Sequence, residues 1–149
     1  ASTGLNGLAN GSSLGASYSA DGRYLAFESD ASNLVADDTN GVRDIFVRDM
    51  TTGTIARASN GDFGQSNGNS YSASISADGS TIHFTSDATN LVSNDTNGTR
   101  DLFSVANPFE FADQLAFAAS NDVDTFDFIP DIASQPTITQ TPASIFEII

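Results

Sequence analysis

The chain contains the same stretch of sequence twice. Residues 16–46 read ASYSADGRYLAFESDASNLVADDTNGVRDIF, and residues 73–103 read ASISADGSTIHFTSDATNLVSNDTNGTRDLF. The two stretches align without a gap at an offset of 57 residues, and 20 of their 31 positions are identical. A repeat of this length and fidelity predicts two copies of one supersecondary unit, at residues 4–60 and 61 to about 105.

Turn sequences divide each copy into short strands. Ser-Ala-Asp-Gly at residues 19–22 and 76–79 is a hairpin signal, because Asp-Gly supplies the two positive-φ positions of a type I′ turn. Asp-Thr-Asn-Gly and Thr-Thr-Gly-Thr mark further turns, and apolar residues such as Leu25 and Phe27 alternate between them. The pattern predicts about four antiparallel strands per copy and no helix. In the first copy the second to fourth strands are expected at 23–29, 44–49 and 55–59.

The sequences of these motifs are also similar to those of a known structural repeat family. The first copy carries SADGRYLAF at 19–27, SDASNLV at 29–35, DTNG at 38–41 and DIFVRD at 44–49. This pattern resembles the TolB-type, WD40-like β-propeller repeat over about residues 4–105. The second copy follows it to Phe103 and then departs, with Ser-Val-Ala-Asn-Pro in place of the Val-Arg-Asp run. The resemblance implies propeller blades but no single function, because such blades serve in binding, scaffolding and, less often, catalytic proteins.

We therefore expect an all-β chain of two four-stranded antiparallel, propeller-like blades and an extended C-terminal strand or tail. The first blade repeat takes residues 1–60, the second 61–117, and the connector and apolar tail strand 118–149. Residues 1–15 have the composition of a loop, and Phe63 in the second connector is expected to pack under a blade edge. The segment FEFADQLAFAA at 109–119 supplies either the fourth strand of the second blade or a short helix.

Composition excludes several classes of function. The net charge is −14, the five cationic residues are all Arg, and Cys is absent. Nucleic acid is a poor partner, because binding it requires Lys and Arg to neutralise phosphates. No run of 18 apolar residues is present, so no membrane span is expected. Strong acidity indicates a solvated surface, divalent cations or a salty setting, and we expect a secreted, extracellular or cell-surface protein.

The inventory of reactive residues predicts that the chain is not an enzyme. His83 is the only histidine, and its counterpart in the first copy is Ala26, so the repeat does not require an imidazole. Without Cys and with one His, nucleophilic Ser/His/Asp and Cys/His schemes lack support. The rival hypothesis is a fragment of an enzyme whose active site lies on other blades.

The acidic turns suggest a calcium site in each copy. Ca²⁺ takes six to eight oxygen ligands from carboxylates, amides and backbone carbonyls. The alternative is that Asp and Asn cap these turns by hydrogen bonds to the backbone while Arg43 and Arg100 pair with neighbouring Asp residues. The candidate ligands are Asp30, Asp38, Asn40 and Asp44 in the first copy and Asp87, Asp95, Asn97 and Asp101 in the second.

Two blades are too few to close a ring, since propellers have about four to eight. Two blades also leave two faces uncovered, and exposed faces and strand edges promote association. The chain is then a piece of a longer propeller, one of several chains that complete a ring, or a subunit of an open polymer. The C-terminal tail offers apolar interface residues, namely Ile138, Ile145, Phe146, Ile148 and Ile149.

From these observations we expect a non-enzymatic extracellular structural protein that self-associates as the subunit of a fibre or filament. The joint is expected to form when the tail of one subunit, residues 137–149, adds as a strand or packs as a wedge on a blade of the next. Two alternatives stay open: a calcium-dependent ligand- or glycan-binding propeller module, and a fragment of a larger β-propeller protein.

Overall fold

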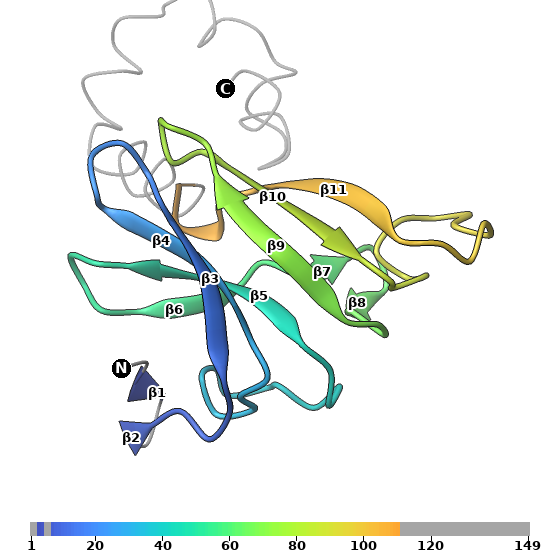
Figure 1. Ribbon diagram of the computed structural model, residues 1–149, viewed down its shortest axis with the longest axis horizontal. Coiled ribbons are helices and arrows are strands. Elements are labelled where there is room, and N and C mark those ends of the chain that lie inside the picture. The colour runs from blue at the N-terminus through green and yellow to red at the C-terminus, as the bar shows by residue number, and fades with distance from the viewer. Residues whose placement is uncertain (1–2, 5–6, 111–149) are drawn as a thin grey trace, which may run out of the picture. The chain divides into compact units, whose positions relative to one another are not determined.

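The computed structural model describes residues 3–4 and 7–110, and this part of the chain is almost entirely β-structure (Figure 1). Both copies of the repeat belong to one compact unit. Within the described residues, helix is limited to one turn at 108–110. No helix there has the length and apolar character needed to cross a membrane. The expected all-β fold class is confirmed.

The first sheet is four-stranded and antiparallel, with the strands in sequence order. The strand expected at 44–49 is confirmed at both ends, the one expected at 23–29 starts one residue later, and the one expected at 55–59 ends at Arg57. In this order, each strand after the first pairs with the strand that precedes it in the sequence. The strands are β3 (Ser13–Tyr18), β4 (Tyr24–Ser29), β5 (Asp44–Asp49) and β6 (Ile55–Arg57).

The second sheet repeats the first at the same spacing. Its described strands run in the order β11-β10-β9 and are antiparallel. They are β9 (Ser70–Ile75), β10 (Thr81–Ser86) and β11 (Asp101–Ala106), each 57 residues after its counterpart in the first sheet. A fourth strand here would fall beyond residue 110, outside the described residues. Residues 109–110 belong to the helical turn, and the rest of segment 109–119 is likewise outside.

Two short ribbons precede the sheets, and the sequence analysis missed them. The strands β1 (Thr3–Gly4) and β2 (Gly7–Leu8) pair before the first sheet, and β7 (Asn60–Gly61) and β8 (Gly64–Gln65) pair before the second. The expectation of a loop over 1–15 was therefore wrong. Phe63, expected to pack under a blade edge, is 67% exposed. It occupies the two-residue turn between β7 and β8, where no sheet covers it.

The hairpin turns also differ from the expected type. A type I′ turn needs positive φ at two residues, but Gly22 is positive at 73° while the only such non-glycine residues described are Ser72 and Asn94. The Gly22 N–H donates to the Ser19 carbonyl at 2.9 Å, so the central turn residues are Ala20 and Asp21, with Gly22 following. Asp21 stays out of the left-handed region because its carboxylate accepts hydrogen bonds from the Ser19 hydroxyl at 2.6 Å and the Arg23 N–H at 3.0 Å.

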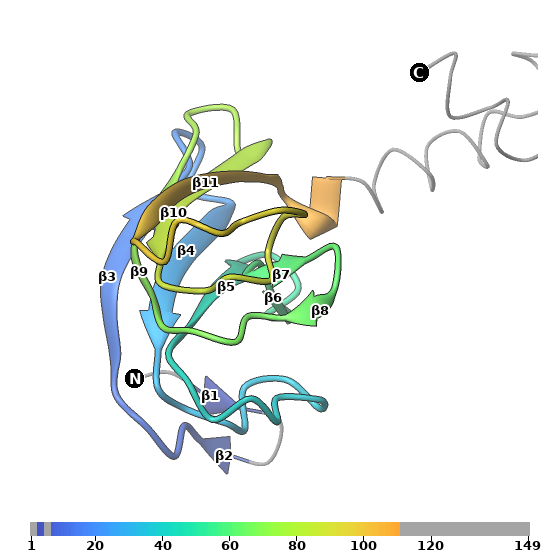
Figure 2. The same cartoon turned by 90° about the vertical axis from the view of Figure 1, so that its right-hand side faces the viewer.

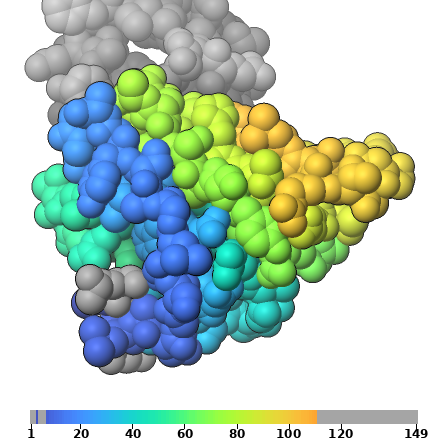
Figure 3. Space-filling model, in the orientation of Figure 1, coloured from blue at the N-terminus to red at the C-terminus, as the bar shows by residue number. Residues whose placement is uncertain are grey.

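The core lies between the two sheets. Strand β9 lies against β3 and β4, as Figures 1 and 2 both show. In the space-filling view the atoms of the first repeat (blue to cyan) meet those of the second (green to orange) along this line (Figure 3). The buried cluster joins both copies: Tyr24, Ala26, Ile45, Val47 and Ala58 from the first, and Ala73, Ile75, Ile82, Phe84, Ala88, Leu91 and Phe103 from the second.

Directional contacts fix how the second sheet sits on the first. The Ser72 N–H donates to Glu28 Oε2 at 2.7 Å, and the Ile75 N–H donates to Ser17 Oγ at 3.2 Å. The guanidinium carbons of Arg43 and Arg100, one from each copy, lie 5.7 and 4.2 Å from the centre of the Tyr71 ring. Such contacts depend on geometry as well as burial, so they favour one register between the sheets.

Candidate functional site

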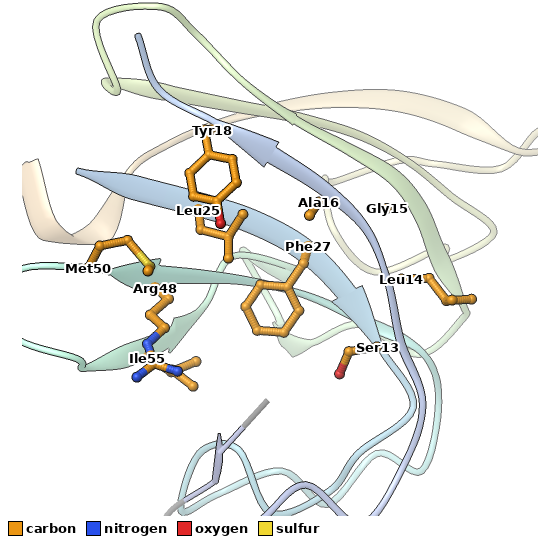
Figure 4. Close-up of a pocket in the computed structure, with 10 residues that line it drawn as sticks. All are labelled: Ser13, Leu14, Gly15, Ala16, Tyr18, Leu25, Phe27, Arg48, Met50 and Ile55. Carbon is orange, nitrogen blue, oxygen red and sulfur yellow. The ribbon is translucent and has the colours of Figure 1, made fainter. Parts of the chain in front are cut away.

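The side of the first sheet that faces away from the second is apolar and hollowed. Ten residues line a hollow of about 540 Å³ there: four at positions 13–16 on β3, and six others whose side chains form most of its surface (Figure 4). We call this surface the open face. It consists of Tyr18 on β3, Leu25 and Phe27 on β4, Arg48 on β5, Met50 just after β5, and Ile55 on β6.

Strand alternation explains why these residues share a surface. On β4, Tyr24 and Ala26 belong to the core between the sheets, so Leu25 and Phe27 point the opposite way. On β5, Arg48 pairs directly with Leu25 and therefore lies beside it on the same side. Phe27 pairs with Phe46, and the two rings stack with centroids 5.8 Å apart. The open face is thus the outer layer of a smaller apolar cluster around Phe27, Ala31, Leu34 and Phe46.

The repeat shows what covers this surface in the second copy. Tyr18, Leu25 and Phe27 correspond to Ile75, Ile82 and Phe84 at the 57-residue offset. Ile82 and Phe84 are 0% and 1% exposed, because they pack on the first sheet. On the open face, in contrast, Tyr18 is 57% exposed where its counterpart Ile75 is 9% exposed, and Leu25 is half-buried, although Phe27 is buried within its own sheet. One repeat surface is therefore covered in the second copy and open in the first.

The face of the second sheet that points away from the first sheet is more polar than the open face. The face of the first sheet that packs on the second presents Tyr24, Ala26, Ile45 and Val47, none more than 1% exposed. The residues at the same repeat positions of the second sheet are Thr81, His83, Leu102 and Ser104. Three of these four are polar, so the second sheet lacks the apolar surface with which the first sheet binds its neighbour.

Arg48 is the cation of the open face. Its counterpart in the second copy is Val105, so the charge is not part of the repeat. Its Nη1 donates to Thr3 Oγ1 at 3.3 Å, and its Nε is buried without a hydrogen-bond partner among the described residues. A guanidinium has five N–H donors and binds carboxylates best. Arg48 therefore places a positive charge at the open face, and the only hydrogen-bond acceptor of its guanidinium among the described residues is the Thr3 hydroxyl.

Two of the predicted calcium ligands, Asp30 and Asp87, form ion pairs with arginine. Arg43 donates to both carboxylate oxygens of Asp30 at 2.8 Å each. Arg100 does the same to Asp87 at 2.8 and 3.0 Å. These hydrogen bonds lower the pKa of both carboxyl groups. The structure thus places Asp30 and Asp87 in separate ion pairs, as the turn-capping alternative expected.

The other predicted ligands of the first copy, Asp38, Asn40 and Asp44, lie around the buried side chain of Arg57. Arg57 Nη1 lies 3.3 Å from Asp38 Oδ1 and 3.7 Å from Asp44 Oδ2. Asp44 also accepts hydrogen bonds from Asn40 Nδ2 at 2.8 Å and Ser59 Oγ at 2.6 Å. Burial raises the pKa of both Asp38 and Asp44, and the Asp44 charge adds to the shift at Asp38. The structure therefore brings Asp38, Asn40 and Asp44 together, around a guanidinium.

Sequence reasoning did not identify Arg57 as part of this cluster. A signal existed, because Arg57 lies within the strand expected at 55–59, next to the strand expected at 44–49 that begins with Asp44. Opposite charges on neighbouring strands commonly form ion pairs, and here Asp44 starts the strand next to that of Arg57.

The second copy has the same carboxylates in different surroundings. Asp95, Asn97 and Asp101 line a hollow of about 410 Å³. Asn97 Nδ2 donates to both oxygens of Asp101 at 3.2 and 3.1 Å, while Asp95 Oδ2 is buried without a hydrogen-bond partner among the described residues. The residue at the repeat position of Arg57 is Gln114, which lies outside them. No cluster of three or more acidic, His or Cys side chains that could hold a metal occurs in the described part.

The predicted interface residues Ile138, Ile145, Phe146, Ile148 and Ile149 all lie outside the described residues. His83 lies on β10, at a position equivalent to the fully buried Ala26. Neither a comparison with protein-family models nor a search of curated proteins found a match to the chain. The described features that bear on function are the two sheets, the open face and the acidic turns.

Proposed function

We propose that the chain is a non-enzymatic, extracellular structural protein that associates with itself through the C-terminal tail. In this proposal its two sheets are propeller-like blades, and the tail of one subunit binds a blade of the next. Each joint uses two different surfaces, so the association continues along an axis and gives a filament.

The open face is the observation that carries this proposal. A surface with the same repeat positions is almost completely buried in the second copy, where Ile82 and Phe84 are 0% and 1% exposed. Apolar surface of this kind gains about 25 cal/mol for each Å² removed from water. Exposed apolar patches with polar borders usually mark protein-interaction sites. The acidity of the chain, with a net charge of −14, supports the extracellular setting.

The experiment compares the full chain with a variant that lacks residues 135–149. Light scattering and sedimentation velocity at increasing concentration measure assembly, and electron microscopy shows its form. We expect filaments from the full chain and none from the shortened one, with equal β-sheet circular dichroism in both. A monodisperse full-length monomer at high concentration would contradict the proposal. It would favour the alternative in which a further blade of a larger propeller covers the open face.

A second candidate function is calcium-dependent ligand or glycan binding. One observation favours it: Asp95 Oδ2 is buried without a hydrogen bond beside Asp101, where the first copy has a guanidinium. No Arg or Lys follows Arg100 in the sequence, so the segment beyond residue 110 holds no cation for this position. Two carboxylates and an amide provide part of a calcium shell, and backbone carbonyls and water would complete it.

A further inference from the structure

We propose that the open face binds residues 145–149 of a second copy of the chain, with the Glu147 carboxylate placed against the Arg48 guanidinium. This inference rests on the proposed self-association and names the two surfaces of the joint.

The open face needs an occupant with both apolar side chains and a negative charge. Its apolar part is the surface that the second copy buries against the first sheet, as Ile75, Ile82 and Phe84 do. Its cation, Arg48, stands where the second copy has Val105. A purely apolar sheet would cover the hollow but bury the Arg48 guanidinium with only the Thr3 hydroxyl as an acceptor among the described residues. Burying an unpaired charge is costly, so a carboxylate must arrive together with the apolar side chains.

The chain itself contains such a segment. All five arginines lie between residues 23 and 100, whereas residues 111–149 contain six acidic residues and no Arg or Lys. Residues 1–110 are also acidic, with 13 Asp and Glu against five Arg, so the opposite charge for the tail is confined to positions such as Arg48. Most of the chain's other acidic residues lie in turns and ion pairs of the folded unit, but the tail carries its carboxylates among Ile and Phe.

Within the tail, residues 145–149 read IFEII. In an extended conformation Ile145, Glu147 and Ile149 share one side, because successive side chains alternate. That side offers an apolar group, a carboxylate and an apolar group in a row. The open face offers Arg48 with Leu25 beside it on the neighbouring strand and Phe27, Met50 and Ile55 around the same hollow (Figure 4). On both surfaces the charged group is then flanked by apolar side chains.

The test reverses each charge in the full-length chain. Arg48→Glu and Glu147→Arg should each raise the concentration needed for assembly at least about tenfold, since loss of a buried charge pair exceeds the free-energy equivalent of tenfold in affinity. An equimolar mixture of the two variants should assemble again, because each tail then meets the opposite charge on the other variant. Asp131→Arg is the matched control for charge and should assemble like the parent. Circular dichroism and thermal unfolding confirm that every variant is folded.

The outcomes separate this inference from the proposal beneath it. A parent chain that never assembles contradicts the proposed function itself. A parent that assembles while Arg48→Glu assembles equally well overturns only the Arg48–Glu147 joint. If the single variants fail and the mixture also fails, while the double variant Arg48→Glu/Glu147→Arg behaves as the parent, the tail binds the face of its own chain, and the second copy as occupant is overturned.

Discussion

Leu25 and Ile82 occupy the same position of the repeat, but Ile82 is completely buried while Leu25 lies at the edge of a hollow. The difference arises because the first sheet covers Ile82, and no described element covers Leu25. Two residues with nearly the same sequence context thus serve different purposes. Ile82 belongs to the core between the sheets, and Leu25 borders the open face.

This difference predicts unequal costs for the same substitution. Ile82→Ala should lower the free energy of unfolding by about 2–5 kcal/mol, because it leaves a cavity between the sheets. Leu25→Ala should cost less than about 1.5 kcal/mol in the unassembled chain, since its side chain is already in contact with water. Urea unfolding below the assembly concentration measures both. Equal costs would show that the open face is covered within one chain.

A second prediction concerns the buried charges around Arg57. Arg57→Met should destabilise the fold by about 3–5 kcal/mol at pH 7, because Asp38 and Asp44 remain buried without a counter-charge. Their pKa values are already raised above 3.8 in the folded chain, and loss of the guanidinium raises them further.

The sign of the pH dependence follows from proton binding. At pH values between 3.8 and the raised pKa values of Asp38 and Asp44, the folded state binds more protons than the unfolded state. The stability of the folded state therefore falls as pH rises. The loss in Arg57→Met should therefore be smaller near pH 4 than at pH 7. Chemical unfolding at both pH values measures it, with Arg57→Lys as the control that keeps the charge. A loss independent of pH would mean that packing of the Arg57 side chain dominates.

A third prediction concerns the turn carboxylate Asp78. Hydrogen bonds from the Ser76 hydroxyl and the Ser80 N–H and hydroxyl lower its pKa from 3.8 to about 2. A carboxyl group whose pKa falls on folding stabilises the fold above its unfolded pKa, and this contribution disappears as pH falls through the folded value. Asp78→Asn should therefore be less stable than the parent at pH 7, and the difference should close near pH 2.

Thermal unfolding across this pH range measures the effect of Asp78→Asn. Asp62→Asn is the control, because Asp62 is exposed and its side chain makes no hydrogen bond to the described residues. A constant difference between Asp78→Asn and the parent down to pH 2 would contradict the role of the ionised carboxylate.

A fourth prediction tests calcium. If Asp95, Asn97 and Asp101 bind Ca²⁺, added CaCl₂ should raise the unfolding temperature by mass action, and a chelator should reverse this. Asp95→Asn should abolish the response. Asp38→Asn should leave it intact, because the guanidinium of Arg57 already occupies the equivalent position in the first copy. An unfolding temperature that neither CaCl₂ nor chelator changes would contradict calcium binding and favour a turn-capping role for these residues.

The strands could be predicted from the sequence because the repeat displays them twice. The end points of β5 follow directly from the alternation of residues 44–49 between two turn motifs. The ribbons β1–β2 and β7–β8 could not be predicted, since their two-residue strands carry Gly and Asn and no alternating apolar pattern. The turn at Asp21 was assigned the wrong type because its side-chain hydrogen bonds compete with the positive-φ conformation.

The candidate site was less accessible to sequence reasoning. Motif spacing brought Asp38, Asn40 and Asp44 together correctly, because they lie within one turn. Ion pairs of Asp30 and Asp87 with Arg43 and Arg100 were the alternative to calcium binding, and the structure contains both ion pairs. The open face could not be located, because its residues are as apolar as those of the covered face. Only the way the second sheet lies on the first distinguishes Leu25 from Ile82.

The contrast between Ala26 and His83 also bears on how the chain reaches this structure. Tandem repeats of high identity are prone to misfold when one copy takes the place of the other. A second copy folded in the position of the first would bury His83 and Ser104 where Ala26 and Val47 are now 0% exposed. The imidazole and hydroxyl would lose their water without gaining partners, at a cost of about 1–3 kcal/mol each. A few polar substitutions within a near-identical repeat thus favour the observed order in which the two copies stack.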